Sequence, residues 1–546
     1  MKQMLILALL GWSFSVLAQT YSNTFTQTWQ DVPWASGGIT PTGSVMSLDG
    51  MIDADGDGNG EFLMSSSWSG AFGNDAILYE ASGDSFVIAW YYWFNNLDLT
   101  NYNYSACTTG DLDADGLPEL IFLNDCGAGQ NALYLFEFDA TLGIFPATPT
   151  SSWNINLPGG VDESGDILVA NIDGDARPEL VMALYSLSPA ASHIIVAEIA
   201  EGSDAANPNW HVEMDDNTAL AYYCYGLQTS DLDGDGKSEI IAVEWNYYRM
   251  VIWENSAEDN YAKVNEFYVS FDPNAFSNEA MAEADFDGNG QSELYLASTE
   301  GYLWVVANVS DVSQMNFASH FYLLGDYQTY GGFNLVGLRT GNADSPTGQT
   351  PDGPDIYLCA TDSTATQSAI FDWEFTGGEV NNFNNYELSQ IYATTYNGSL
   401  FMPSKMAIGD ANGDGKQEIV VGSMSLSTGT PHVIALTADG QTAISPDETP
   451  VNSPENFALL GNYPNPFNPA THLRYRLLTG GEVQLTIFDA NGKMVKTLVR
   501  EQQSPGEYDI EWDGRDSNGA IVASGLYFSR LQFGNAAQTR KMMLVR

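Results

Sequence analysis

Short apolar runs recur along most of the chain, and each follows an acidic, glycine-containing loop. Five of these runs are ELIFL from Glu119, ELVMAL from Glu179, EIIAV from Glu239, ELYLA from Glu293 and EIVVG from Glu418. They are rich in Ile, Val, Leu and Tyr, they are only about five residues long, and turn-forming residues follow them. The pattern predicts short buried strands rather than helices.

The acidic loops are regularly spaced. Six copies begin at positions 53, 111, 171, 231, 285 and 410, so that successive starts are 58, 60, 60, 54 and 125 residues apart. Further strand-like segments lie in these intervals, among them AILYE from Ala76, RMVIWEN from Arg249 and HVIALTA from His432. About four strands per period of roughly 60 residues is typical of a β-propeller blade. An open β-solenoid would need a much shorter period with glycine-rich turns, which the sequence lacks.

The long last interval is close to two periods and predicts one further copy of the loop. The segment from Gly341 to Leu358 contains an insertion but keeps four polar residues of the pattern, namely Asn342, Asp344, Asp352 and Asp355. We therefore expect an all-β fold, with a β-propeller of about seven blades over residues 19–444. The degenerate copy is expected to occupy the remaining blade without a complete ligand set.

Within each of the six loops the polar ligand-type residues stand at positions 1, 3, 5 and 9, usually with Gly at position 6. Alternate side chains of a tightly turning loop converge on one point. Several hard oxygen ligands suit Ca²⁺, whereas Mg²⁺ tends to keep its waters. Carboxylates packed this closely would repel one another without a cation. Position 12 is apolar in every copy, so these are not helix-loop-helix calcium motifs.

The loops therefore predict up to about six Ca²⁺ ions. The predicted ligands are Asp53, Asp55, Asp57, Glu61, Asp111, Asp113, Asp115, Glu119, Asn171, Asp173, Asp175, Glu179, Asp231, Asp233, Asp235, Glu239, Asp285, Asp287, Asn289, Glu293, Asp410, Asn412, Asp414 and Glu418. An Asn replaces one carboxylate in the third, fifth and sixth copies, and Ala176 replaces the usual Gly in the third. These three copies are expected to bind more weakly.

The chain carries 70 acidic and 18 basic residues, for a formal net charge of −52. Such a charge repels phosphate groups and excludes nucleic acid as a partner, whereas cations are expected partners. Ten of the 18 basic residues lie in the last 75 positions, which indicates a separate C-terminal domain.

The two ends of the chain have patterns of their own. Residues 1–18 contain a lysine, a long apolar run and the ending Val16-Leu17-Ala18, as in a secretory signal peptide, with an N-terminal membrane anchor as the alternative. No later apolar stretch approaches the roughly 20 residues of a membrane-spanning helix, so no transmembrane segment is expected after cleavage. Residues 445–455, SPDETPVNSPE, indicate a linker, and residues 456–546 contain short strands separated by turns, as in a small Ig-like β-sandwich.

Two families resemble parts of this sequence. The acidic loops with their following strands, over about residues 51–443, resemble FG-GAP/VCBS-type repeats. That resemblance implies an integrin-α-like propeller with calcium in the blade hairpins, where the metal is mostly structural and the ring is a platform for ligands.

The C-terminal segments NYPNPFNPAT from Asn462, WDGRDSNG from Trp512, SGLYFSRL from Ser524 and the final TRKMMLVR resemble type IX secretion C-terminal sorting domains of type A. That resemblance implies export by the type IX secretion machinery, which would be a partner of this domain. It also implies a secreted protein or one attached to the outside of a bacterial outer membrane. Removal of the sorting domain remains open.

Four cysteines in so long a chain do not form a disulfide scaffold. Cys107 and Cys126 flank one acidic loop, which leaves a single bridge between them open, whereas Cys224 and Cys359 are expected as buried thiols. The five histidines lack the spacing of a zinc site, and no G-x-S-x-G motif is present.

These observations favour a protein that binds a glycan or a protein over an enzyme. A propeller-based polysaccharide lyase or hydrolase is the alternative, because the many carboxylates provide candidate catalytic pairs. A purely structural surface module is a third reading. Aromatic clusters at 90–94, 222–225 and 245–248 are expected mainly in the core, with room for an exposed ring that stacks on a ligand.

Overall fold

The computed structural model describes residues 25–30, 44–67, 74–83, 85–94, 105–157, 159–187, 190–220, 222–245, 249–257, 259–269, 281–327, 333–343, 353–362, 367–395, 403–414, 416–423, 433–438, 457–463, 467, 469–477, 480–489, 493–504, 506–517, 519–533 and 536–544. The predicted signal peptide (1–18) and the predicted linker (445–455) lie outside these residues. The chain forms two compact units. The larger unit extends to Thr442, and the smaller unit contains the C-terminal strands that follow Ala443.

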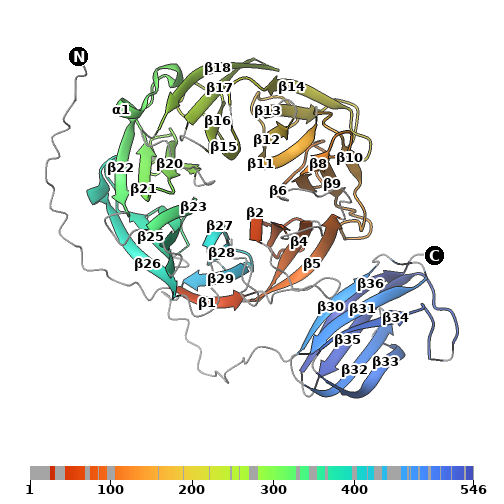
Figure 1. Ribbon diagram of the computed structural model, residues 1–546. Coiled ribbons are helices and arrows are strands. Elements are labelled where there is room, and N and C mark those ends of the chain that lie inside the picture. Colours follow the sequence, from red (N-terminus) through yellow and green to blue (C-terminus); the bar gives the residue numbers. More distant parts are fainter. Residues whose placement is uncertain are drawn as a thin grey trace, which may run out of the picture. The chain divides into compact units, whose positions relative to one another are not determined.

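Seven antiparallel sheets form a ring of blades in the larger unit (Figure 1). The first three blades are made of the following strands. Blade 1 has β2 (Ser44–Ile52), β3 (Glu61–Ser67), β4 (Asn74–Ser82) and β5 (Ser85–Phe94); blade 2 has β6 (Ser105–Gly110), β7 (Glu119–Asn124), β9 (Leu133–Glu137) and β10 (Ser151–Trp153); and blade 3 has β11 (Gly160–Ala170), β12 (Glu179–Leu187), β13 (Ala190–Ile199) and β14 (Trp210–Asp216), with the two-residue β8 (Cys126–Gly127) added beside β11.

The remaining blades follow the same order from the centre of the ring outward. Blade 4 has β15 (Cys224–Ser230), β16 (Glu239–Glu244), β17 (Arg249–Ala257) and β18 (Asn260–Tyr268); blade 5 has β19 (Met281–Ala284), β20 (Glu293–Ala297), β21 (Tyr302–Val306) and β22 (Phe321–Asp326); blade 6 has β23 (Phe333–Gly341), β24 (Asp355–Asp362), β25 (Gln367–Phe375) and β26 (Tyr386–Thr395); and blade 7 has β27 (Pro403–Gly409), β28 (Glu418–Ser423), β29 (Val433–Ala438) and β1 (Phe25–Gln30). The prediction of seven blades is confirmed.

Helix is scarce in the described residues. It consists of the 3₁₀ turns η2 (Val312–Gln314) and η3 (Phe383–Asn385) and the single-turn α1 (Phe317–His320). None of these is long and apolar enough to cross a membrane.

The second strand of each blade is the most deeply buried. All six residues are buried in β7, in β16 and in β28. These strands carry the continuous apolar runs seen in the sequence because both of their faces are covered by neighbouring blades. The apolar clusters of the ring confirm this, since each unites residues of two adjacent blades, for example Ile195 of blade 3 with Leu123 of blade 2.

The ring closes through the first and last parts of the fold. Each innermost strand contacts the next, in the order β2, β6, β11, β15, β19, β23 and β27, and β27 contacts β2. The N-terminal strand β1 pairs with β29 of blade 7. Its Trp29 also makes edge contacts with Phe62, Tyr79 and Phe86 of blade 1. One strand therefore joins the two ends of the ring, which leaves few exposed sheet edges.

Several predicted aromatic rings fill the space between blades. Trp90 is 9% exposed and packs on Phe122 and Phe136 of blade 2, and Phe94 is also buried. The expectation of a core position holds for Trp90 and Phe94, whereas Tyr91 and Tyr92 of this first aromatic cluster are only half-buried. The side chain of Trp93 and residues 246–248 lie outside the described part.

The four cysteines are free thiols. The bridge between Cys107 and Cys126, which the sequence left open, is not formed. Cys107 on β6 pairs in register with Phe122, whereas Cys126 lies beyond the end of β7 and pairs with Val161 of blade 3. Cys224 and Cys359 are buried, as predicted.

The C-terminal unit is a small β-sandwich of two antiparallel sheets. One contains β30 (Phe457–Tyr463), β31 (Thr471–Leu477) and β34 (Gly506–Trp512), and the other contains β32 (Gly481–Asp489), β33 (Met494–Gln503), β35 (Gly525–Phe533) and β36 (Ala536–Leu544). Its core includes Phe467, Tyr475 and Trp512, which are at most 1% exposed. The predicted Ig-like sandwich is confirmed.

Candidate metal centres

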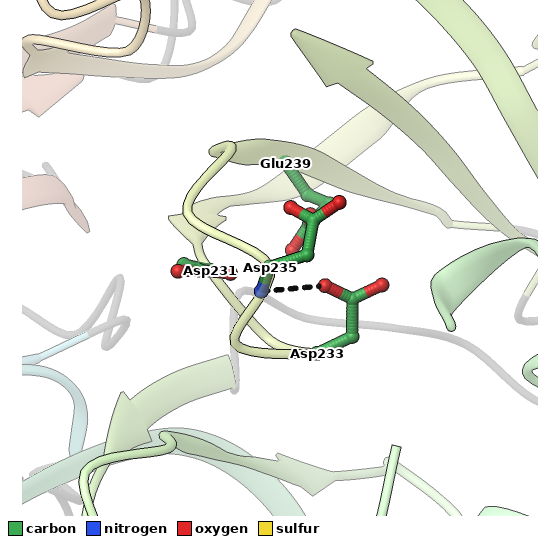
Figure 2. Close-up of side chains that lie close together, drawn as sticks. All are labelled: Asp231, Asp233, Asp235 and Glu239. Atoms are coloured by element: carbon green, nitrogen blue, oxygen red, sulfur yellow. Dashed lines mark hydrogen bonds between the residues drawn. The ribbon is translucent and has the colours of Figure 1, made fainter. Parts of the chain in front are cut away.

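Each acidic loop joins the innermost strand of a blade to the second strand. Figure 2 shows the loop of blade 4, where Asp231, Asp233, Asp235 and Glu239 gather around one point. One ligand oxygen from each of the four lies within 4.8 Å of the others. This is the convergence that the spacing predicted.

The backbone of the blade 4 loop holds these carboxylates in place. The Gly236 N–H donates to Asp231 Oδ2 at 3.0 Å, and the Asp235 N–H donates to Asp233 Oδ1 at 3.2 Å, which is the dashed line in Figure 2. Gly236 has a φ of +86°, a conformation that glycine adopts without strain. Loop shape and ligand position are therefore fixed together by the sequence.

The glutamate at position 9 is anchored in the same way in all six loops. Its Oε2 accepts the N–H of the residue at position 2, in the pairs Ala54–Glu61 (2.6 Å), Leu112–Glu119 (2.7 Å), Ile172–Glu179 (2.5 Å), Leu232–Glu239 (2.7 Å), Phe286–Glu293 (3.0 Å) and Ala411–Glu418 (3.0 Å). These glutamates are at most 4% exposed. Each begins a second strand and is held at the inner side of its loop.

The other oxygen of this glutamate has a different environment. Oε1 is buried and has no hydrogen-bond partner in Glu61, Glu119, Glu179 and Glu239, and the same is true of Asp231 Oδ1. A buried carboxylate oxygen without a partner is costly, because it loses its hydration. A divalent cation bound to the loop would satisfy it, so these residues fit Ca²⁺.

Burial also shifts the acidity of these glutamates. Loss of water, with a contribution from the neighbouring aspartates, raises the pKa to about 8 for Glu61, Glu179 and Glu239 and to about 9 for Glu119. For Glu293 the pKa is raised to about 7. A cation in the loop favours the charged form and acts against this shift.

The structure brings most of the predicted ligands together. Oxygens of Asp53, Asp55 and Asp57 form one close group, and oxygens of Asp111, Asp113 and Asp115 form another. The loops of blades 5 and 7 share the backbone hydrogen bonds of blade 4. The Asn289 N–H donates to Asp287 at 3.1 Å, and the Asp414 N–H donates to Asn412 at 2.9 Å.

The third loop differs from the others. Its position 1 residue, Asn171, donates its side-chain amide to the Asp175 carbonyl at 2.8 Å and accepts the Gly174 N–H at 2.8 Å. Here the close group of oxygens comes from Asp173, Glu179 and Glu213. Glu213 lies on β14 and is not part of the loop pattern.

The degenerate copy in blade 6 has a relay in place of the anchoring glutamate. The Ala343 N–H donates to the Tyr357 hydroxyl at 2.9 Å, and this hydroxyl donates to Asp355 Oδ2 at 2.7 Å. Because Asp is one methylene shorter than Glu, the tyrosine spans the remaining distance. Asp344 and Asp352 lie outside the described residues.

Sequence reasoning missed a second row of carboxylates. On the third strands of three blades a glutamate stands directly opposite the position 9 glutamate, in the pairs Glu61–Glu80, Glu119–Glu137 and Glu239–Glu254. Like charges directly opposite destabilise a sheet unless they are neutralised. In blade 4, Lys237 Nζ lies 2.7 Å from Glu254. The glutamates that recur 15 to 19 positions after position 9 were the available signal.

The loops also contact the following blade. Asp113 Oδ2 accepts the N–H of Ala205 in blade 3 at 2.8 Å, and Asp233 Oδ2 accepts the N–H of Val312 in blade 5 at 2.9 Å. A position 3 aspartate thus has one oxygen toward its own loop and one toward a neighbour. A cation here would stabilise the seam between blades as well as the hairpin.

One polar row in blade 3 has the order of a catalytic triad. Ser186 Oγ lies 3.2 Å from His193 Nε2, and His193 Nδ1 lies 2.8 Å from Asp215 Oδ1. However, Ser186 is 0% exposed and His193 is 4% exposed, so a substrate does not reach the serine. The row links β12, β13 and β14 as part of the fold.

Comparisons with known proteins match two segments to family models. Residues 231–296 match an FG-GAP-like repeat, and residues 479–534 match a FlgD Ig-like domain. The first segment includes the loops of blades 4 and 5, and the second lies within the C-terminal sandwich. A search of the curated proteins finds no match.

Three solved structures are similar to this chain at low identity. PorZ, an essential bacterial surface component of the type-IX secretion system of Porphyromonas gingivalis, has 12% identity and a TM-score of 0.40, and the match covers 94% of this chain and 61% of that chain. BBS1N in complex with ARL6DN has 9% identity, a TM-score of 0.43 and coverage of 78% and 99%. The rhamnogalacturonan lyase YesW has 15% identity, a TM-score of 0.40 and coverage of 78% and 76%. This chain thus spans less than two thirds of the PorZ chain.

Proposed function

We propose that this protein is an exported, calcium-stabilised β-propeller that presents a surface for a glycan or protein ligand and carries out no catalysis. The observation that carries the proposal is the position 9 glutamate. It is buried and held by one oxygen, and in four loops its other oxygen is left without a hydrogen-bond partner. Ca²⁺ in the loops would neutralise these groups, so the metal serves the stability of the ring.

Export is proposed from the C-terminal sequence. The segments that resemble type IX sorting domains belong to a unit with a core of its own, as a separable sorting domain requires. We expect the type IX secretion machinery to bind this unit and to deliver the propeller to the medium or the outer surface of the cell. Deletion of residues 456–546 should leave the protein inside a producing cell that has this system. Secretion of the shortened chain would contradict this part of the proposal.

A cluster of aromatic rings is the best candidate for the ligand surface. Tyr223 lies 4.4 Å from Tyr185 and 6.3 Å from Trp245 between ring centroids, and all three are half-buried. Neighbouring Tyr222 is 40% exposed. Tyr185 and Trp245 lie near the C-terminal ends of β12 and β16, whereas the acidic loops lie at the beginnings of these strands. Partly exposed aromatic rings are suited to stacking on a sugar ring or a peptide.

The ligand proposal is tested by binding. The full chain is screened against glycan and protein arrays in Ca²⁺ and in chelator, and binding in Ca²⁺ is expected to fall in chelator. Trp245→Ala should weaken binding about 10-fold, whereas Tyr268→Ala should not, because Tyr268 is an exposed ring outside the cluster. No binding, together with product release from a polysaccharide panel, would overturn the proposal.

A carbohydrate-active enzyme is a second candidate, and one observation favours it. Lys405 lies on β27 and Asp166 on β11, the innermost strands of blades 7 and 3, and each of these charges favours the charged form of the other. Burial lowers the pKa of Lys405 to about 8, in the range useful for a general base. If a polysaccharide is cleaved, Lys405→Met should abolish cleavage while the chain stays folded.

A further inference from the structure

The third loop has Asn171 at position 1, where the other five loops have an aspartate. In blade 4, Asp231 Oδ1 is buried without a partner, whereas both polar atoms of the Asn171 side chain are used inside their own loop. The glycine of position 6 is also replaced, by Ala176. The side chain at position 1 of this loop therefore contributes little to the binding of a cation.

A different group of oxygens is assembled at the inner side of the same loop. Asp173 comes from the loop, Glu179 begins β12 and Glu213 lies on the outermost strand β14, and one oxygen of each lies within 4.8 Å of the others. Glu179 is 0% exposed. Its Oε2 accepts the Ile172 N–H, and its Oε1 has no hydrogen-bond partner.

Glu213 is oriented by the next blade. Its Oε2 accepts the hydroxyl of Tyr261, on β18 of blade 4, at 2.8 Å. Its Oε1 is buried and has no hydrogen-bond partner. Glu179 and Glu213, two members of one close group, each have a buried oxygen without a hydrogen-bond partner. This points to a bound cation, since each such oxygen has lost its water and the two charges repel each other.

No basic side chain neutralises the group within the described residues. The guanidinium of Arg177 donates to the carbonyls of Ile199 and Ser203 instead. His211 is paired with Asp259 at 3.2 Å, and the Asp259 N–H donates to Asp173 at 3.4 Å. The contact from this side to Asp173 is therefore a backbone N–H and not a basic side chain.

We infer that blade 3 binds its divalent cation between Asp173, Glu179 and Glu213, away from position 1 of the loop, with Tyr261 as a positioning residue. This inference rests on the proposed binding of calcium by the ring. The site would link three elements of blade 3 to blade 4. Its ligand set includes a carboxylate 34 positions after position 9, which the loop pattern does not contain.

The test is the metal content of the full chain. Wild type, Glu213→Gln, Asn171→Ala and the control Glu201→Gln are equilibrated with Ca²⁺, freed of unbound metal and analysed by mass spectrometry. Glu213→Gln should hold one Ca²⁺ ion fewer per chain than wild type. Asn171→Ala should hold the full number, and so should Glu201→Gln, because Glu201 is exposed.

A second variant keeps the test valid if Glu213→Gln does not fold. Tyr261→Phe removes only the hydroxyl that orients Glu213, and it should weaken one Ca²⁺ site about 10-fold without removing it. Full metal content in Glu213→Gln, with loss of an ion in Asn171→Ala, would place the cation in the loop and overturn the inference. If Glu213→Gln holds the full number of Ca²⁺ ions and unfolds at a higher temperature than wild type in chelator, the carboxylates share a proton rather than a cation. That outcome would also overturn the inference. A wild-type chain without Ca²⁺ would overturn the proposed function as well, so the two failures are distinguishable.

Discussion

The two oxygens of the position 9 glutamate have different roles. In Glu239, Oε2 is held by the Leu232 N–H, and Oε1 is buried without a protein partner. The first contact fixes the side chain at the start of the second strand. The second leaves an acceptor for a cation. The position 9 glutamate thus has one oxygen that holds the hairpin loop and one that is available to a metal ion.

Replacing this residue separates the two roles. Glu239→Gln keeps an oxygen for the Leu232 N–H but removes the charge, so the chain should bind one Ca²⁺ ion fewer. In Ca²⁺ the unfolding midpoint should fall by about 2–4 °C, as a loss of roughly 1 kcal/mol would produce. In chelator it should change little. Metal analysis and calorimetry check this, with exposed Glu201→Gln as the control. An equal fall in chelator would indicate a purely structural role.

The raised pKa values of the position 9 glutamates predict how the metal-free chain responds to pH. The pKa of Glu61 is about 8 in the folded chain, against 4.5 as its ordinary value. The folded state therefore binds more protons than the unfolded state between these values, and stability falls as pH rises through this window. Below it, both states are protonated and the penalty is absent.

Thermal unfolding in chelator should therefore show a falling midpoint between about pH 5 and 8. Added Ca²⁺ should raise the midpoint most at the upper end of that range. The dependence should be shallower in Glu239→Gln, which has lost one of the titrating groups. A midpoint in chelator that is independent of pH would contradict the prediction.

The sequence predicted the loop carboxylates because their spacing is local. The convergence of Asp231 to Glu239 follows from nine consecutive residues. Glu213 and Tyr261 were missed because their contact depends on the register of β14 and on the packing of two blades. The opposed Glu119–Glu137 pair likewise depends on strand register. Such contacts between distant positions are not contained in a local pattern.

At the scale of elements, the innermost strands lie unusually close together. A side chain at Gly165 of β11 would place its Cβ 1.8 Å from the Cys224 carbonyl oxygen of blade 4. At Gly337 of β23 the distance to the Ser404 carbonyl oxygen of blade 7 would be 2.1 Å. Both glycines adjoin an irregularity in the strand register. At both positions the backbones of neighbouring innermost strands are in direct contact.

Gly165→Ala should therefore be strongly destabilising. The neighbouring backbone must move to admit the methyl group, and we expect a loss of about 3 kcal/mol or more in the free energy of unfolding. Gly127→Ala is the matched control, because the atom nearest to its added Cβ would belong to the Gln130 side chain, at an ordinary contact distance of 3.7 Å. Denaturant unfolding in Ca²⁺ compares the two. Equal stability of the two variants would show that the backbones of the neighbouring innermost strands move apart at little cost in free energy.

The elements themselves were largely predictable. Runs such as EIIAV and EIVVG are buried strands, as expected from their composition and length. The two-residue strand β8 and the relay through Tyr357 were not predicted. Strand β8 forms because Cys126 and Gly127, which follow β7, pair with β11 of blade 3. The Tyr357 hydroxyl compensates for the shorter side chain of Asp355. Both depend on three-dimensional neighbours.

For the whole molecule, closure of the ring depends on one N-terminal strand. β1 completes blade 7 by pairing with β29, and its Trp29 packs on three rings of blade 1. The repeat spacing predicted the number of blades, because seven periods account for the region. It did not show that the outer strand of the last blade comes from the beginning of the chain, since β1 precedes the first acidic loop.

Trp29→Ala should weaken the closure and lower the stability of the entire ring. Loss of a large, partly buried ring is expected to cost about 3 kcal/mol. Gln27→Ala is the control on the same strand, because the Gln27 side chain is exposed and donates to Gln30 of the same strand. Hydrogen exchange of β29 and β2 provides the measurement. Unchanged protection of both strands in Trp29→Ala would show that closure does not depend on this residue.

The pairing of β1 with β29 also orders events in time. Thr28 and Thr437, whose hydroxyls lie 3.1 Å apart, are separated by 409 positions. Of the described strands of the ring, β1 is therefore synthesised first, and its partner β29 is synthesised last. Contacts between such distant segments form slowly. Any chain cut short before β29 keeps an unpaired strand at one end and an open sheet at the other. Chains that end before β29 should accordingly aggregate or be degraded, whereas full-length chains should do neither.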